Sequence, residues 1–163
     1  MEQRFYPEKK RHGGVIEQNY FALRLRYSIS DTGRNNAVPF YLQETIGGSD
    51  ISNEQTLPAF KDYRFRGPDL LTVQFEYDRK ICVTCSLCGE GITRTVCSHL
   101  GLVLRYDAGN VGMSWNDFSV SNLRQSYSGG VAIYLGKDVI FRMAVGLGGG
   151  EGIHPYFGVA NFL

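Results

Sequence analysis

Five segments of this sequence alternate apolar and polar residues with a period of two, which is typical of β-strands. In residues 70–80, one face carries Leu71, Val73, Phe75 and Tyr77, and the other carries Thr72, Gln74, Glu76, Asp78 and Lys80. The other four segments are residues 21–28, 99–109, 122–135 and 138–147. Strands in soluble proteins are typically about 5–6 residues long, whereas a strand that crosses a bilayer needs roughly 9–11. We therefore predict membrane-spanning strands with an apolar face toward lipid and a polar face toward a wet lumen. A soluble antiparallel sandwich is the alternative, because its strands also alternate.

The number of predicted strands is small for a closed barrel. With a last strand expected at 155–163, the sequence predicts about six, which would close only into a very narrow barrel. We therefore expect an all-β fold in which residues 1–163 are a C-terminal fragment of a larger antiparallel transmembrane β-barrel. The first strands and an export signal are expected upstream, because the charged segment 1–12 lacks the apolar core of a signal peptide. The strand at 21–27 and the last strand should each leave an edge unpaired, unless they meet each other.

The connections set the expected orientation of these strands. Outer-membrane barrels have long external loops and short periplasmic turns. Residues 30–69 and 110–121 are therefore expected to be external loops, and residues 136–138 a periplasmic turn. The Cys-rich turn at 83–98 is the exception to this rule. Its place between the strands makes it a periplasmic turn, but it is long.

Several short motifs follow one another along the chain. They are Val-Pro-Phe-Tyr-Leu at 38–42, Ile-Gly-Gly-Ser-Asp at 46–50, Phe-Lys-Asp-Tyr-Arg-Phe-Arg-Gly at 60–67, Gln-Phe-Glu-Tyr at 74–77 and Tyr-Asp-Ala-Gly-Asn-Val at 106–111. This ordered set resembles the C-terminal part of the BamA-like surface-antigen family of outer-membrane assembly and translocation barrels. The resemblance implies a sixteen-stranded barrel in the bacterial outer membrane, with periplasmic domains upstream and a long external loop folded back into the lumen.

The sequence departs from the family pattern in that loop. The family has a Val-Arg-Gly-Phe or Val-Arg-Gly-Tyr tetrad, whereas residues 57–60 here are Leu-Pro-Ala-Phe, without the arginine. In the family the arginine meets the acidic residue of a strand motif, which corresponds here to Asp107. Residues 105 and 107 share a face of the strand, so Arg105 is expected to neutralise Asp107. Arg64 and Arg66 are the rival partners, and a solvated charge cluster is the alternative to a functional contact.

The resemblance also implies a non-enzymatic mechanism, in which the seam between the first and last strands opens and templates an incoming strand. An unpaired backbone edge in lipid is driven to find a partner. The expected partners are outer-membrane lipids, unfolded outer-membrane protein clients and periplasmic accessory proteins. The candidate residues are Arg64, Phe65 and Arg66 in the lumen loop, Glu76, Arg105 and Asp107 on the lumen wall, and Gly158 and Phe162 in the seam strand.

Four cysteines lie in or beside the 83–98 turn: Cys82, Cys85, Cys88 and Cys97. Four thiolates are enough for a tetrahedral zinc site. The first three are closely spaced and the first lies at a strand end, which makes joint ligation harder. The periplasm favours disulfides, so we expect at least one disulfide, with a zinc site as the alternative and otherwise no cofactor.

Other functions receive less support from the sequence. The three histidines are scattered, no Gly-x-Ser-x-Gly motif occurs, and the glycine-rich segment 146–152 is read as an external turn, so no enzymatic activity is expected. A net charge of +1 argues against nucleic-acid binding. Two alternatives stay open. The first is a pore or the barrel anchor of a membrane enzyme such as a patatin-like lipase, and the second is a small zinc- or disulfide-stabilised soluble β module.

Overall fold

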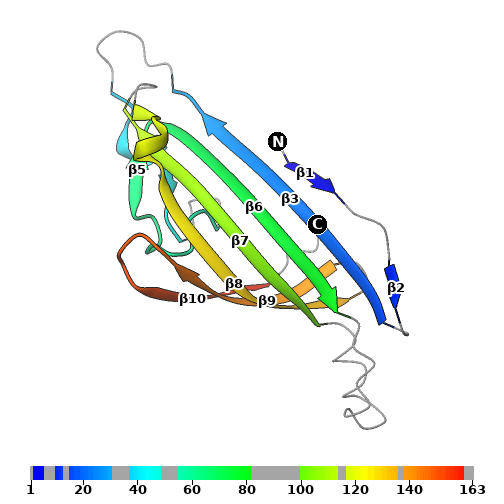
Figure 1. Cartoon of the computed structure of the whole chain (residues 1–163). Coiled ribbons are helices and arrows are strands. Elements are labelled where there is room, and N and C mark those ends of the chain that lie inside the picture. Colours follow the sequence, from blue (N-terminus) through cyan, green and yellow to red (C-terminus); the bar gives the residue numbers. More distant parts are fainter. Residues whose placement is uncertain are drawn as a thin grey trace.

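The computed structural model of this chain contains one large antiparallel β-sheet of eight strands (Figure 1). Its order is β1-β3-β6-β7-β8-β9-β10, and β2 also pairs with β3. The strands are β1 (Glu2–Phe5), β2 (Lys10–His12), β3 (Val15–Ser28), β6 (Asp69–Ile81), β7 (Leu100–Gly112), β8 (Arg124–Leu135), β9 (Asp138–Leu147) and β10 (Ile153–Val159). The structure describes residues 2–5, 10–12, 15–30, 37–48, 55–81, 100–113, 117–135 and 138–159.

Five strands are long, as the alternating pattern predicts. β3 has 14 residues, β6 and β7 have 13 each, β8 has 12 and β9 has 10. Each pairs with the next in antiparallel register, for example Glu76 of β6 with Arg105 of β7. The all-β, antiparallel part of the prediction is therefore confirmed.

The connection from β3 to β6 carries the smaller elements. It contains the short 3-10 helix η1 (Phe40–Leu42) and a two-stranded sheet of β4 (Glu44–Ile46) and β5 (Phe65–Gly67). A second 3-10 helix, η3 (Val120–Asn122), precedes β8. We call residues 44–48 and 55–67 the inner loop, because they pack on one face of the large sheet, and the sheet curls around them (Figure 1). We call that face the inner face and the opposite one the outer face.

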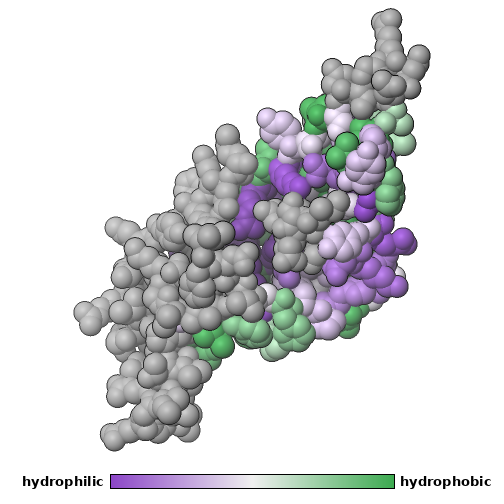
Figure 2. Space-filling model, turned by 180° about the vertical axis from the view of Figure 1, so that it is seen from behind, coloured by the Kyte–Doolittle hydropathy of each residue, from purple (hydrophilic) through white to green (hydrophobic). Residues whose placement is uncertain are grey.

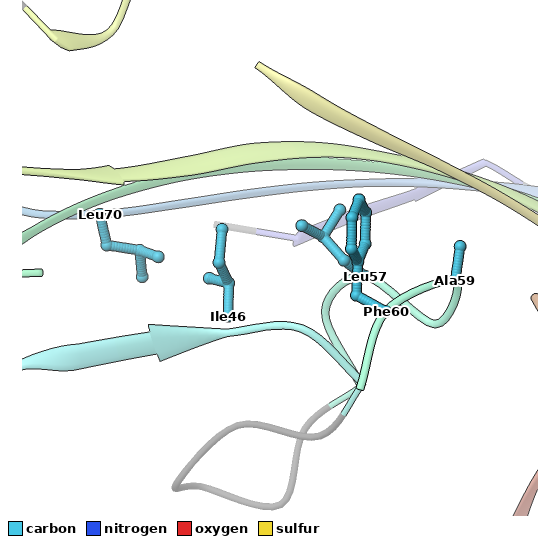
Figure 3. Close-up of a cluster of buried hydrophobic side chains, with 5 residues drawn as sticks. All are labelled: Ile46, Leu57, Ala59, Phe60 and Leu70. Carbon is cyan, nitrogen blue, oxygen red and sulfur yellow. The ribbon is translucent and has the colours of Figure 1, made fainter. Parts of the chain in front are cut away.

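A small hydrophobic cluster joins the inner loop to the sheet. Ile46 of β4 and Leu57, Ala59 and Phe60 of the loop are buried with Leu70 of β6 (Figure 3). Figure 3 shows these side chains in a layer between the loop and the sheet. The loop is therefore anchored by burial of apolar surface as well as by polar contacts.

The two faces of the sheet differ as expected. The outer face leaves large apolar side chains exposed on β3, β6, β7, β8, β9 and β10, whereas Glu76, Arg105 and Asp107 are buried on the inner face. From behind, hydrophilic side chains gather in the middle of the view and hydrophobic ones lie toward the rim (Figure 2). Among the described residues no second sheet or helix covers the outer apolar set. The predicted division into an apolar and a polar face is therefore confirmed, and contact of the apolar face with lipid stays a prediction.

The edges of the sheet correct two predictions. The charged N-terminal segment, for which no strand was predicted, contains β1 and β2, which pair with β3. The edge of β3 is therefore not left unpaired, and the sheet has eight strands where about six were predicted. β10 runs from Ile153 to Val159 and so begins two residues earlier than the predicted 155–163. In the described residues β1 and β10 end the strand order, and the sheet is not closed.

Candidate functional site

The inner loop is first held in shape by its own backbone. Two backbone hydrogen bonds join its two parts. The Gly48 amide donates to the Leu57 carbonyl, and the Thr56 amide donates to the Gly48 carbonyl, each at 2.9 Å. The Thr56 hydroxyl accepts a hydrogen bond from the Gly47 amide at 3.0 Å. These bonds satisfy polar groups that the loop buries against the sheet. The segment 55–60 thus lies on the inner face as a compact turn.

Arg105 of β7 is the main polar contact between the wall and this loop. Its Nε donates to Oδ1 of Asp107 at 2.8 Å, and its Nη2 lies 2.7 Å from the same oxygen. The same Nη2 donates to the carbonyls of Gln55 and Thr56, the latter at 3.5 Å. The Arg105 and Asp107 side chains are only 4% and 1% exposed. One buried guanidinium therefore neutralises the wall carboxylate and binds the loop backbone.

This contact confirms one prediction and settles which arginine makes it. Arg105, not Arg64 or Arg66, is the partner of Asp107, because residues two apart in a strand share a face. Arg64 contacts Glu151 instead, and Arg66 donates to the Phe40 carbonyl at 2.8 Å and stacks on the Phe40 ring. The Arg105 cation is thus on the wall, where it binds the Asp107 carboxylate of its own strand and the Gln55 and Thr56 carbonyls of the loop.

Two further bonds join the loop to the wall. The Ala59 amide donates to Oγ of Ser126 on β8 at 2.9 Å, and Nε2 of Gln74 on β6 donates to the Gln55 carbonyl at 3.0 Å. Gly146 of β9 lies directly beneath Pro58, and a β-carbon there would overlap the Pro58 carbonyl. The loop therefore touches four neighbouring strands, β6 to β9.

Replacing Ser126 by alanine is expected to lower the free energy of unfolding by about 1–3 kcal/mol, because the buried Ala59 amide loses its acceptor. Urea unfolding of the folded protein measures this change. The control is Ser121→Ala on η3, whose exposed hydroxyl bonds only exposed neighbours, and for which we expect a change within about 0.5 kcal/mol. Equal effects of the two variants would contradict the role assigned to Ser126.

Glu76 forms a second ion pair on the inner face. Its two oxygens accept hydrogen bonds from both terminal nitrogens of Arg142 at 2.9 Å, and Arg142 also lies 3.8 Å from Asp78. Glu76 is on β6 and Arg142 on β9, with β7 and β8 between them. In a flat sheet those strands would be about 14 Å apart, so the pair depends on the curl of the sheet. The alternating pattern places Glu76 and Arg142 on the same face of the sheet, but it did not predict that they pair.

Phe65 lies in an aromatic and cationic cluster at the base of the loop. Its ring packs edge-on against Phe60, with 5.2 Å between centroids, and the guanidinium of Arg124 lies 3.9 Å from its centroid. The Arg64 guanidinium is 5.6 Å away. Phe65 therefore packs against Phe60 within the loop and joins the loop to Arg124 of β8 by a cation–π contact.

Glu151, which sequence reasoning missed, lies in the turn between β9 and β10. Its Oε1 is 2.5 Å from Nε of Arg64, and its Oε2 accepts a hydrogen bond from the Lys61 amide at 3.2 Å. The hydrogen bond from Arg64, followed by that from Lys61, lowers the pKa of the Glu151 carboxyl. The carboxylate therefore remains charged as the pH falls to its ordinary pKa, and the contact is lost only when the pH falls through the lowered value.

Of the remaining candidates, Gly158 lies near the end of the described residues, and Phe162 and the cysteines lie outside them. Gly158 is on β10 opposite Arg142, and a β-carbon there would meet nothing within 4 Å. Phe162 and the four cysteines Cys82, Cys85, Cys88 and Cys97 are outside the described residues. Within the described ranges, no three His, Cys, Asp or Glu side chains are grouped so as to hold a metal ion.

The disulfide therefore stays a prediction, which thiol titration of the unfolded protein tests. We expect fewer than four free thiols without reductant and four with it. Four free thiols without reductant, together with stoichiometric zinc by elemental analysis, would contradict it.

Comparison of the chain with models of protein families, with curated proteins and with solved structures finds no match. None of the helices in the described residues is long and apolar enough to span a membrane.

Proposed function

We propose that this chain forms part of the wall of an outer-membrane β-barrel that acts, without enzymatic chemistry, in the insertion or translocation of other outer-membrane proteins. The observation that carries the proposal is the contrast between the two faces of the sheet. One face exposes apolar side chains over six neighbouring strands, and the other buries charges beneath a folded-in loop.

The outer face has the composition that lipid contact requires. Its exposed members are Phe21, Leu23, Leu25, Tyr27, Phe75, Leu100, Leu102, Leu104, Tyr127, Val131, Met143, Val145, Leu147, Ile153 and Phe157. Soluble monomers rarely expose contiguous apolar patches larger than a few hundred Å², and such patches mark membrane or protein contacts. The strands that carry these side chains mostly reach the length needed to cross a bilayer.

The inner face supports a loop-filled lumen rather than a simple apolar core. The Glu76–Arg142 and Arg105–Asp107 pairs are polar wall groups of the kind that barrels turn inward. The inner loop rests on them through its backbone, at the place where the resemblance expects a returning external loop. This loop favours an assembly or translocation barrel over the alternative of a passive pore or enzyme anchor.

A folding assay with the intact protein in phospholipid vesicles tests the proposal. The probe is a urea-unfolded outer-membrane protein, whose folding is followed by its shift in gel mobility. We expect the client to fold faster with the protein present than in empty vesicles or in vesicles containing an unrelated barrel of similar size. Equal rates in all three would overturn the assembly function, and failure of the protein to float with the vesicles would overturn the membrane assignment as well.

A further inference from the structure

The turn between β9 and β10 makes a polar contact with the inner loop that is separate from the loop's hydrogen bonds to β6, β7 and β8. The two oxygens of Glu151 accept from two different parts of the loop, the Arg64 side chain and the Lys61 backbone. These groups are neighbours on the returning arm of the loop. A single carboxylate therefore joins the last hairpin of the sheet to that arm.

An apolar contact at the same turn strengthens the connection. Gly149 lies against the ring of Phe60, and a β-carbon at this position would overlap three atoms of that ring. Phe60 is itself buried in the cluster that anchors the loop to the sheet. Gly149 thus brings the turn backbone directly against the loop core.

Farther along β10, the strand and the loop are separated by space. A cavity of about 320 Å³ is lined by Gln55, Pro58 and Phe60 from the loop and by His154, Pro155 and Tyr156 from β10. Tyr156 reaches across β9 to Ser128 of β8, with its hydroxyl 3.1 Å from Oγ of that serine. Among the described residues the hairpin therefore meets the loop at its turn and at Gly146 of β9, and not along β10.

We infer that Glu151 and Gly149 couple the β9–β10 hairpin to the inner loop, so that β10 can leave its neighbours only when the loop also moves. The inference rests on the proposed function, in which β10 is the seam strand that must be released. Under this arrangement the loop regulates the seam. A loop seated on Arg105 and Ser126 keeps the hairpin in place, and a displaced loop frees it.

Two glycines of the turn provide a matched pair of variants. Gly149 and Gly150 both have positive φ, at 64° and 73°, so alanine is strained to a similar degree at either position. Only Gly149 faces Phe60, because nothing lies within 4 Å of a β-carbon at Gly150. The difference between Gly149→Ala and Gly150→Ala therefore isolates the loop contact from the backbone strain.

Amide hydrogen exchange of the intact folded protein, followed by mass spectrometry, is the measurement. We expect Gly149→Ala to speed exchange by about tenfold relative to Gly150→Ala, both in β10 and in residues 55–60, because the two segments open together. We also expect Glu151→Arg to speed exchange in both segments, and the swapped variant Arg64→Glu with Glu151→Arg to restore much of the protection.

Faster exchange in only one of the two segments, or equal exchange in the two glycine variants, would overturn the coupling. The assay needs neither a client nor vesicles, so its outcome is separate from that of the folding assay. If exchange is coupled but the client does not fold faster, the proposed function is wrong and the coupling stands. If the client folds faster but exchange is not coupled, the coupling is wrong and the proposed function stands.

Discussion

Replacing Arg105 by methionine is expected to lower the free energy of unfolding by about 3–5 kcal/mol, the usual cost of breaking a buried ion pair from one side. Methionine keeps most of the aliphatic bulk but leaves the carboxylate of Asp107, which is 1% exposed, without its guanidinium. The carbonyls of Gln55 and Thr56 lose the same donor. Urea or heat unfolding of the folded protein measures the change, and proteolysis of residues 55–60 should become faster.

The control for this variant removes the charge on both sides. Arg105→Met combined with Asp107→Leu leaves no unpaired buried charge, so we expect it to recover most of the lost stability. In the double variant the Thr56 carbonyl still lacks the Arg105 donor and the Gln55 carbonyl keeps only Gln74, so proteolysis of the loop should stay fast. A single variant that costs less than about 1 kcal/mol would show that the pair is screened like a surface pair.

The pairing of Arg105 with Asp107 was predictable because it depends only on local geometry. Residues two apart in any strand share a face, so the sequence is enough to place the two side chains together. The same rule predicted which side chains of β3, β6, β7, β8 and β9 are exposed and which are buried. Local periodicity thus predicts the long strands, their two faces and the Arg105–Asp107 pair of the candidate site.

The contacts that could not be predicted join residues far apart in the chain. Arg142 and Glu76 are 66 residues apart and meet only because the sheet curls, and Arg64 and Glu151 are 87 residues apart. Glu151 also lies among glycines, where no periodic pattern marks its direction. Tertiary geometry, which no local pattern encodes, decides these pairs.

The edge strands were missed for a different reason. β1 and β2 are four and three residues long and carry several charged side chains, so they show no alternation. Their pairing with β3 uses backbone hydrogen bonds, which any non-proline residue can make. Short edge strands with charged residues are also a common way to limit unwanted pairing, so a weak sequence signal is expected there.

Replacing Leu104 by arginine is expected to lower the free energy of unfolding in vesicles by about 2–4 kcal/mol, the range for a cation on the lipid face of a barrel near the bilayer midplane. Leu104 is on the outer face of β7 and is 47% exposed, so the same change on a water-facing sheet would cost within about 0.5 kcal/mol.

The control is Val120→Arg on η3, where the valine is 84% exposed and lies outside the large sheet, and for which we expect little change. Urea unfolding in vesicles measures both variants. A large loss for Leu104→Arg alone supports lipid contact at the outer face, because no buried polar group or cavity explains it. Equal and small losses would mean that the outer face meets water or another protein, and the membrane assignment would then be wrong.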